Sequence, residues 1–154
     1  MKHRTDILIR TATTEDVEDL SRLYLQLIPD ARLDPDAMRD AVLRMACESS
    51  GATIYVAELD GRIVGTLQAI VFDNLVRSPS KRAVLESSVV DETVRGHGIG
   101  ATLLENVLAE LKRQGCGKVL LGSSPERCGA QCLYDKVGFR EFGKAYLMTF
   151  DSES

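Results

Sequence analysis

The stretch VRGHGIG sets three glycines and two basic residues at the start of an amphipathic helical pattern: Arg95, Gly96, His97, Gly98 and Gly100. Glycine disfavours a helix by about 1 kcal/mol per position relative to alanine, so this start needs another reason. The first N–H groups of a helix have no partners within it, and the helix dipole adds about half a positive charge there. Glycines let a phosphate oxygen approach those groups closely. The spacing therefore favours a pyrophosphate site, with a ligand-free glycine-rich turn as the alternative.

Two common nucleotide motifs do not account for this stretch. The chain has no Gly-x4-Gly-Lys-Ser/Thr, which is typical of nucleotide-hydrolysing loops. GHGIGA formally fits the Gly-x-Gly-x-x-Gly/Ala pattern of dinucleotide-binding folds. It lies late in the chain, however, after a hairpin and without the second half of such a fold.

RGHGIG also resembles the signature Arg/Gln-x-x-Gly-x-Gly/Ala of the GNAT superfamily of acetyl-CoA-dependent N-acetyltransferases. LESSVVDETVRGHGIGATLLENVLAELKRQGCGKVLL is similar to that family's central strand, pyrophosphate loop, helix and following strand. AQCLYDKVGFREFG is similar to its C-terminal motif, in which Ala-x-x-Phe-Tyr precedes a Gly-Phe pair. Two motifs at the right separation, within residues 85–143, carry the resemblance.

The resemblance implies a binding site for acetyl-CoA. The pyrophosphate would be bound by backbone N–H groups of the loop and helix start, formed by Arg95, Gly96, His97, Gly98, Ile99, Gly100 and Ala101. The pantetheine arm would lie along the preceding strand at Ser88, Val89 and Val90. Arg127 stands where many members carry an asparagine that contacts the cofactor, and here it would reach a phosphate.

Two further residues match catalytic positions of the family. Tyr134 matches a tyrosine that protonates the departing thiolate, and Glu86 matches a strand carboxylate that serves as a base, directly or through water. The residues alone leave two alternatives open, a core tyrosine at 134 and a solvated carboxylate at 86. In simple alternation Glu86 and Ser88 share one face of the strand, whereas Val89 lies on the other.

The chemistry implied is direct attack of an amine on a thioester within a ternary complex. An amine is mostly protonated at pH 7 and needs a base, whereas the thiolate leaves readily because thiol pKa values lie near about 8.5. A splayed or bulged strand around Val89 and Val90 is expected to supply oxyanion donors. A Cys-His-Asp arrangement is not recognisable in the sequence, so a covalent acyl-cysteine route is disfavoured.

The elements that must position these residues follow from periodicity and turn signals. Strands are expected at 7–13, 53–59, 62–72, 82–90, 118–123 and 145–150, and helices at 13–28, 34–49, from the glycine loop to Gly115, and at 125–138. Asp60 and Gly61 predict a hairpin turn. The pattern predicts an α/β fold, and with the resemblance a mixed, mostly antiparallel central sheet flanked by helices.

Composition limits the function classes. The 154 residues fit a single domain, 1–154, and 44% hydrophobic with 27% charged residues is typical of a globular chain. The net charge of −4 argues against a nucleic-acid partner. No secretory signal or membrane span is recognisable, so the expected location is the cytoplasm. The four cysteines lack a Cys-x2-Cys pair and are expected to be buried thiols, with no metal site.

The sequence thus predicts an N-acetyltransferase that moves an acetyl group to a primary amine of a small molecule. The alternatives are a protein or peptide acetyltransferase and a non-catalytic acyl-CoA-binding module. The acidic balance suits a cationic acceptor of either size. The determinants of acceptor choice are expected in 14–28, 34–49 and 73–81. Apolar edges at 62–72 and in the C-terminal strands indicate a homodimer.

Overall fold

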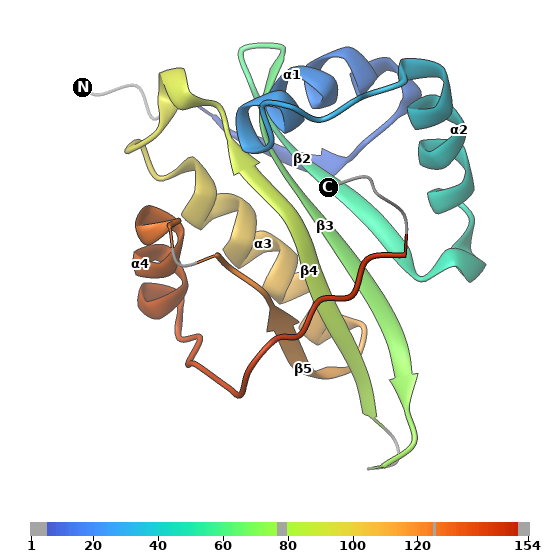
Figure 1. Cartoon of the computed structure of the whole chain (residues 1–154), viewed down its shortest axis with the longest axis vertical. Coiled ribbons are helices and arrows are strands. Elements are labelled where there is room, and N and C mark those ends of the chain that lie inside the picture. Colours follow the sequence, from blue (N-terminus) through green and yellow to red (C-terminus); the bar gives the residue numbers. More distant parts are fainter. Residues whose placement is uncertain (1–5, 77–79, 125, 151–154) are drawn as a thin grey trace. The chain divides into compact units, whose positions relative to one another are not determined.

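A computed structural model describes residues 6–76, 80–124 and 126–150 of the chain (Figure 1). These residues form two compact units, Met1–Leu121 and Gly122–Ser154, each of which is described by itself. Within the described ranges no helix combines the length and the apolar character that a bilayer crossing requires.

The first unit is built on a five-stranded sheet whose strands lie in chain order. They are β1 (Leu8–Thr11), β2 (Ala52–Leu59), β3 (Arg62–Asn74), β4 (Ser80–Val90) and β5 (Cys116–Leu121). The first four strands are antiparallel to their neighbours, whereas β5 runs parallel to β4. The predicted mixed, mostly antiparallel sheet is therefore confirmed, and Asp60 with Gly61 forms the turn between β2 and β3.

Three α-helices accompany this sheet: α1 (Val17–Leu27), α2 (Pro35–Met45) and α3 (Ile99–Arg113). Short 3-10 turns occupy Thr14–Asp16, Glu48–Ser50 and Glu92–Val94. The start of α2 shows why the sequence predicts it, because the Asp34 carboxylate accepts the N–H groups of Asp36 and Ala37 at 3.0 and 3.2 Å. Pro35 then fills the first helical position, where no N–H is needed.

The helices cover both faces of the sheet. On one face, Leu20 and Leu23 of α1 pack in a buried cluster with Val56 and Val89. On the other face, Ile99 and Leu103 of α3 lie against Gly65, which pairs with Ala57 in β2. Since Val56 and Ala57 are neighbours in one strand, they point to opposite faces, and the core has two layers around β2, β3 and β4.

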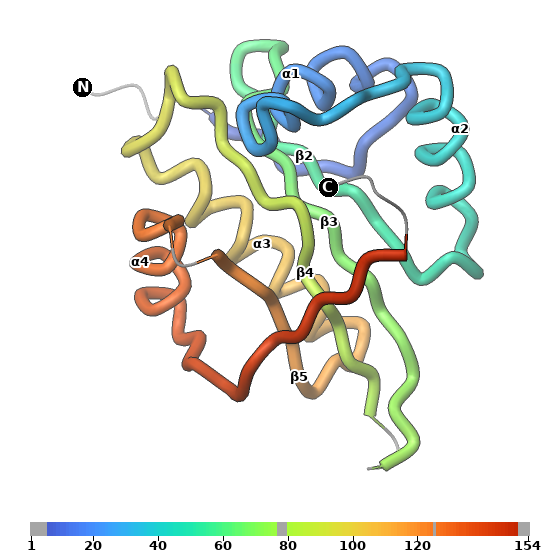
Figure 2. The backbone as a smooth tube through the Cα atoms, viewed as in Figure 1, coloured from blue at the N-terminus to red at the C-terminus, as the bar shows by residue number. Residues whose placement is uncertain are grey.

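The second unit contains α4 (Cys128–Val137), which ends at Gly138 as predicted. The strand predicted at 145–150 is wrong: this stretch has no regular structure, and Tyr146, Leu147 and Phe150 are each 91% exposed. Its apolar run satisfies the composition of a strand, but a strand also needs a neighbouring backbone to pair with. Figure 2 traces it as an irregular segment.

The cysteines differ from the expectation of buried thiols. Cys47, Cys128 and Cys132 are exposed and Cys116 is half-buried. Cys47 follows the last turn of α2, in the connection to β2, and Cys128 and Cys132 stand four residues apart on one face of α4. Position at a helix end or on an outer face therefore overrides the usual preference of cysteine for the core.

Candidate active site

The glycine loop lies between the end of β4 and the start of α3, which begins at Ile99 (Figures 1 and 2). Gly96 and Gly98 adopt φ angles of +81° and +80°, a conformation that side chains disfavour. Apart from the glycine itself and its two chain neighbours, no atom lies within 4 Å of the position that a Cβ would take at either residue. Both glycines are thus required by the backbone, and they leave open space beside the helix start.

The start of α3 presents unsatisfied backbone donors. The first hydrogen bond of the helix joins the Thr102 N–H to the Gly98 carbonyl at 3.0 Å. Within the described part of the chain, the N–H groups of Ile99, Gly100 and Ala101 have no acceptor. The first turn also carries no acidic residue. Three donors and a positive helix end without a competing carboxylate make a suitable anion site.

The two basic residues of the loop brace it. Arg95 donates from Nε to the Val90 carbonyl at 2.9 Å, which ties the loop back to the end of β4. His97 Nδ1 lies 3.1 Å from the carbonyls of both Val94 and Arg95. The imidazole therefore contacts the loop's own backbone, in addition to any role toward a ligand.

Strand β4 contains a bulge just before the loop. Glu86 pairs with Gln68 and Val89 with Thr66, so two residues of β4 oppose one residue of β3. Ser87 takes a φ of +52°, which is rare outside glycine. The predicted bulge is confirmed, although it lies slightly earlier in the strand than the expected site around Val89 and Val90. Bulges often occur next to active sites, where they redirect side chains and backbone groups.

The bulge also corrects the predicted orientation of Glu86. Simple alternation places Glu86 and Val89 on opposite faces, and this prediction is wrong. Their partners Gln68 and Thr66 are two residues apart in β3 and therefore share one face. Because Val89 packs with Leu20, Glu86 lies on the face that α1 covers in part, and its side chain is exposed to solvent.

The pairing between β4 and β5 ends just before the bulge in β4. Their pairing begins at Lys81 with Cys116 and ends at Leu85 with Leu121. In the described residues, the last part of β4 therefore has β3 on one side and no strand on the other. An extended ligand can be added to such an edge as a further strand, which is how the resemblance places the pantetheine arm at Ser88, Val89 and Val90.

The other two predicted residues belong to the second unit. Tyr134, on α4, is only 8% exposed, and its ring meets that of Phe139 edge to face at 5.9 Å between centroids. The Phe139 N–H donates to the Tyr134 carbonyl at 2.9 Å. Arg127 stands just before α4, and its N–H donates to the Ser124 carbonyl at 3.1 Å. The first unit thus contains Glu86, the β4 edge and the loop, and the second contains Tyr134 on α4 and Arg127 just before it.

Comparison with known proteins decides the family. The Acetyltransferase (GNAT) family matches residues 15–139, which is most of the chain. The chain belongs to the GNAT acetyltransferase family. It is therefore an N-acetyltransferase, with acetyl-CoA as its co-substrate.

Individual relatives agree with this assignment. The chain is 29% identical over 132 residues to glucosamine 6-phosphate N-acetyltransferase 1 of Oryza sativa subsp. japonica, covering 82% of this chain and 78% of that one. A solved structure described as an acetyltransferase from Agrobacterium tumefaciens str. C58 has a TM-score of 0.84 at 26% identity, covering 92% of this chain and 99% of that one. An aminoglycoside N-acetyltransferase in complex with CoA shares the fold, with a TM-score of 0.79, 21% identity and 97% of each chain covered. Other curated relatives are longer, and the chain spans 42% of their length.

The residues of the GNAT loop fit the pyrophosphate of acetyl-CoA. A side chain at Gly96 or Gly98 would fill open space next to the helix start, from which a phosphate could reach the N–H groups. The donors of Ile99, Gly100 and Ala101 match the acceptor-only chemistry of phosphate oxygens.

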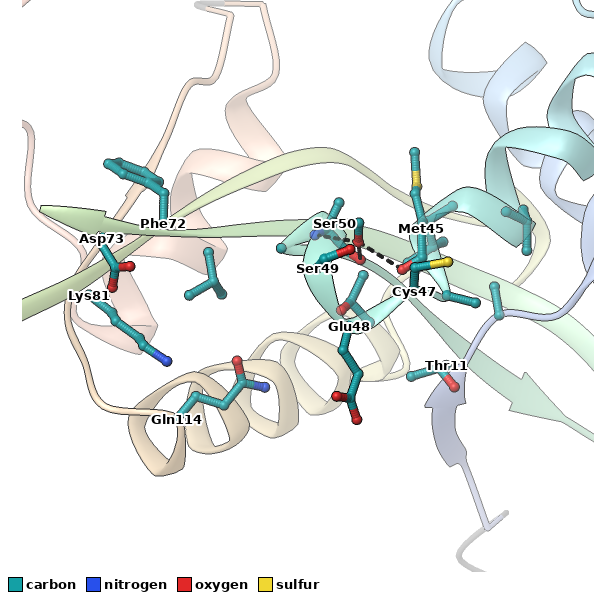
Figure 3. Close-up of a pocket in the computed structure, with 18 residues that line it drawn as sticks. Thr11, Met45, Cys47, Glu48, Ser49, Ser50, Phe72, Asp73, Lys81 and Gln114 are labelled. Carbon is teal, nitrogen blue, oxygen red and sulfur yellow. Dashed lines mark hydrogen bonds between the residues drawn. The ribbon is translucent and has the colours of Figure 1, made fainter.

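A separate pocket of about 510 Å³ lies at the other end of the sheet (Figure 3). It is lined by the turn after α2, including Glu48 and Ser50, and by Lys81 at the start of β4. Ser50 is held there by hydrogen bonds to the carbonyls of Met45 and Ala52, at 2.9 and 3.2 Å. Lys81 is nine residues before Val90, about 30 Å along the strand, so this pocket is distinct from the glycine loop.

Asp91, the first residue after β4, is a further residue next to the loop to which no sequence motif assigns a role. Its side chain is 1% exposed and accepts hydrogen bonds from the N–H and hydroxyl of Thr93, at 3.0 and 2.8 Å. It also forms an ion pair with Arg22 of α1. Burial by itself raises the pKa of Asp91, but the Thr93 hydrogen bonds and the Arg22 cation outweigh it and lower the pKa to about 2. The sequence feature that could indicate Asp91 is a carboxylate directly after an apolar strand, four residues before Arg95 of the loop.

The low pKa of Asp91 predicts an acid-sensitive contribution to stability. Because its pKa is about 2 in the folded chain and 3.8 is its ordinary value, the contribution is complete above pH 4 and is lost as the pH falls toward 2. The shift corresponds to about 2 kcal/mol of unfolding free energy. Asp91→Asn should therefore flatten the fall in unfolding free energy between pH 4 and pH 2, as measured by urea titration.

Glu110→Gln is the matched control for this experiment. The pKa of Glu110 is also lowered to about 2, first by the hydrogen bond from Arg113, but its side chain is 31% exposed. Solvent screens such surface pairs, so the control should change the acid dependence much less. Equal effects of the two variants would contradict the role of the buried pair.

Proposed function

We propose that this GNAT chain transfers the acetyl group of acetyl-CoA to a primary amine of a small molecule. The observation that carries the proposal is the glycine loop, with three unsatisfied N–H donors, after a bulged strand whose last residues have no pairing partner in β5. The rice relative, whose name specifies the amine of glucosamine 6-phosphate, supports an acceptor of this size. The family match runs through both units, which supports one acetyltransferase domain over 1–154.

In the proposed reaction Glu86 acts as the base. Its exposed carboxylate takes a proton from the ammonium form of the acceptor, directly or through water, and so frees the nitrogen lone pair. The nitrogen then attacks the thioester carbon. Backbone donors at the end of β4 stabilise the negative charge that develops on the carbonyl oxygen. The C–N bond forms, the cationic nitrogen of the adduct loses its second proton to water, and the C–S bond breaks to release the thiolate. No nucleophile of the protein is needed.

Tyr134 acts in this proposal as the acid that protonates the departing thiolate. Arg127 contributes a cation toward a phosphate of the coenzyme. Support for both roles comes from their match to family positions, and for Tyr134 also from a ring fixed by Phe139, which restricts the hydroxyl.

Tyr134→Phe tests the acid. This change keeps the ring and its contact with Phe139, so folding and acetyl-CoA affinity should be retained. The kcat should fall about tenfold, at or below the lower end of general acid catalysis, because a thiolate leaves readily. Steady-state kinetics at saturating acetyl-CoA measure the effect, and Tyr146→Phe, at a 91% exposed position, is the control. Wild-type turnover in Tyr134→Phe would reduce Tyr134 to a packing residue.

The acceptor class is tested by acetyl transfer to a panel. The panel combines amino sugars, amino sugar phosphates, polyamines and peptides with free N-termini or lysines, and the release of CoA thiol is followed. We expect transfer to one class of small amine, with an acetylated product by mass spectrometry. Transfer to peptides alone would establish the protein-acetyltransferase alternative, and acetyl-CoA binding without transfer would establish the binding module.

We also propose a homodimer in the cytoplasm. The edge expected at 62–72 is wrong, because that strand is β3 and pairs with β2 on one side and β4 on the other. The outer edges of β1 and β5 are instead unpaired within the described sheet, and the stretch 145–150 exposes several apolar side chains. Exposed thiols such as Cys47 suit a reducing compartment. Sedimentation at micromolar concentration should give twice the chain mass, and the monomer mass alone would exclude the dimer.

A further inference from the structure

The residues that join β4 to the glycine loop are held from three directions. The Asp91 N–H donates to the Val64 carbonyl of β3 at 2.8 Å. One carboxylate oxygen of Asp91 accepts both hydrogen bonds from Thr93, in the short turn that leads into the loop. The other oxygen faces Arg22 of α1 and, at 3.4 Å, Arg62 of β3. A single buried carboxylate thus connects the sheet, the turn and α1.

Arg22 is itself fixed by several partners. It donates to the Ile63 carbonyl at 2.7 Å and pairs with Asp19 one turn earlier in α1 at 3.1 Å. One turn later in α1, the Gln26 side chain accepts the Glu92 N–H at 2.9 Å. Side chains of α1 therefore bind two successive residues, Asp91 and Glu92, just before the loop.

The loop depends on the same short segment. The Val94 N–H donates to the Asp91 carbonyl at 3.1 Å, and Arg95 donates to the Val90 carbonyl at 2.9 Å. A rotation of the backbone at Asp91 would move both acceptors and with them the start of the loop. The donors of α3 would then shift relative to the end of β4, and a ligand that must contact both would lose contacts at one of them.

We propose that Asp91 and Arg22 are positioning residues, which hold the pyrophosphate loop in the geometry that binds coenzyme A. This inference rests on the proposed function, specifically on the assignment of the loop to the pyrophosphate. The inference also gives α1 a role beyond packing, because Arg22 and Gln26 of this helix contact the residues that lead into the loop.

The test compares two buried carboxylates that each pair with an arginine. Asp91→Asn keeps an oxygen for Thr93 and removes the charge that faces Arg22. The control Asp16→Asn removes a carboxylate that is 7% exposed and accepts two hydrogen bonds from Arg10, at 2.7 and 2.8 Å, with no contact to the loop. Both variants should melt at lower temperature than the wild type. Calorimetry with CoA well below those temperatures should give about tenfold weaker binding for Asp91→Asn and unchanged binding for Asp16→Asn.

Kinetics separate positioning from catalysis. For Asp91→Asn, KM for acetyl-CoA should rise by a similar factor, while kcat at saturating acetyl-CoA stays within about threefold of the wild type. Arg22→Lys is the second variant, because it keeps the charge but loses the fork that contacts Asp91 and the Ile63 carbonyl together. It should bind CoA with intermediate affinity, and Arg10→Lys is its control.

Wild-type CoA affinity in Asp91→Asn and in Arg22→Lys would overturn the inference and leave the pair a role in stability alone. If Asp91→Asn does not fold, Arg22→Lys against Arg10→Lys decides by the same criterion. Gly98→Val distinguishes a failure of the positioning role from a failure of the loop assignment. If Gly98→Val loses CoA while Asp91→Asn does not, only the positioning role fails, and if Gly98→Val binds CoA normally, the loop assignment itself fails.

Discussion

Replacing Gly98 by valine should lower the affinity for acetyl-CoA by about a hundredfold or more. Gly98 has a φ of +80°, so a branched side chain strains the loop, and its methyl groups occupy the open space beside the helix start. At least two hydrogen bonds from the helix N–H groups to a charged phosphate would be lost, and each contributes about 1.5–3 kcal/mol to the binding free energy. Isothermal titration, and the rise in melting temperature on adding acetyl-CoA, measure the loss.

The control for this prediction is Gly115→Val at the opposite end of the same helix. Gly115 also has a positive φ, +90°, and no atom lies within 4 Å of a Cβ there. Gly115→Val should therefore lower the free energy of unfolding by a similar amount while leaving acetyl-CoA binding intact. Equal affinities in the Gly98 and Gly115 variants, both folded, would remove the pyrophosphate assignment.

Replacing Glu86 by glutamine should lower kcat/KM for the acceptor by about a hundredfold at pH 7, within the range of general base catalysis. Glutamine preserves size and exposure but cannot take a proton. Because alkaline pH supplies the free amine without a base, the deficit should shrink as the pH rises toward the pKa of the acceptor, near 10 for an alkyl amine. The pH–rate profile from pH 6 to 10 is the measurement.

Glu105→Gln, at an exposed position of α3, controls for the loss of one negative charge. Its profile should overlay that of the wild type. A profile of Glu86→Gln that differs from the wild type in neither height nor shape would assign the base to water or to another residue.

Local signals predicted the loop and the helix after it. The glycines at 96 and 98 and the apolar stripe of α3 act within a few residues, so their spacing is visible in the sequence. The same holds for the Asp34 and Pro35 start of α2. Such features depend on backbone conformation and on hydrogen bonds between near neighbours.

Long-range pairing set the features that the sequence missed or placed at the wrong residues. The bulge at Ser87 is defined by its register against β3, and it reverses the face expected for Val89 relative to Glu86. Asp91 shows its importance only when Arg22, 69 residues away, lies beside it. The stretch 145–150 has the composition of a strand, but strand formation depends on a partner edge that composition cannot specify.

The most direct measurement of where the coenzyme binds is amide hydrogen exchange of the whole chain with and without acetyl-CoA. Acetyl-CoA should slow exchange at Ile99, Gly100 and Ala101 and in the last residues of β4, and should cause no change in the turn 47–51 that lines the separate pocket. Slower exchange confined to residues 47–51, or unchanged exchange at the start of α3, would contradict the pyrophosphate assignment.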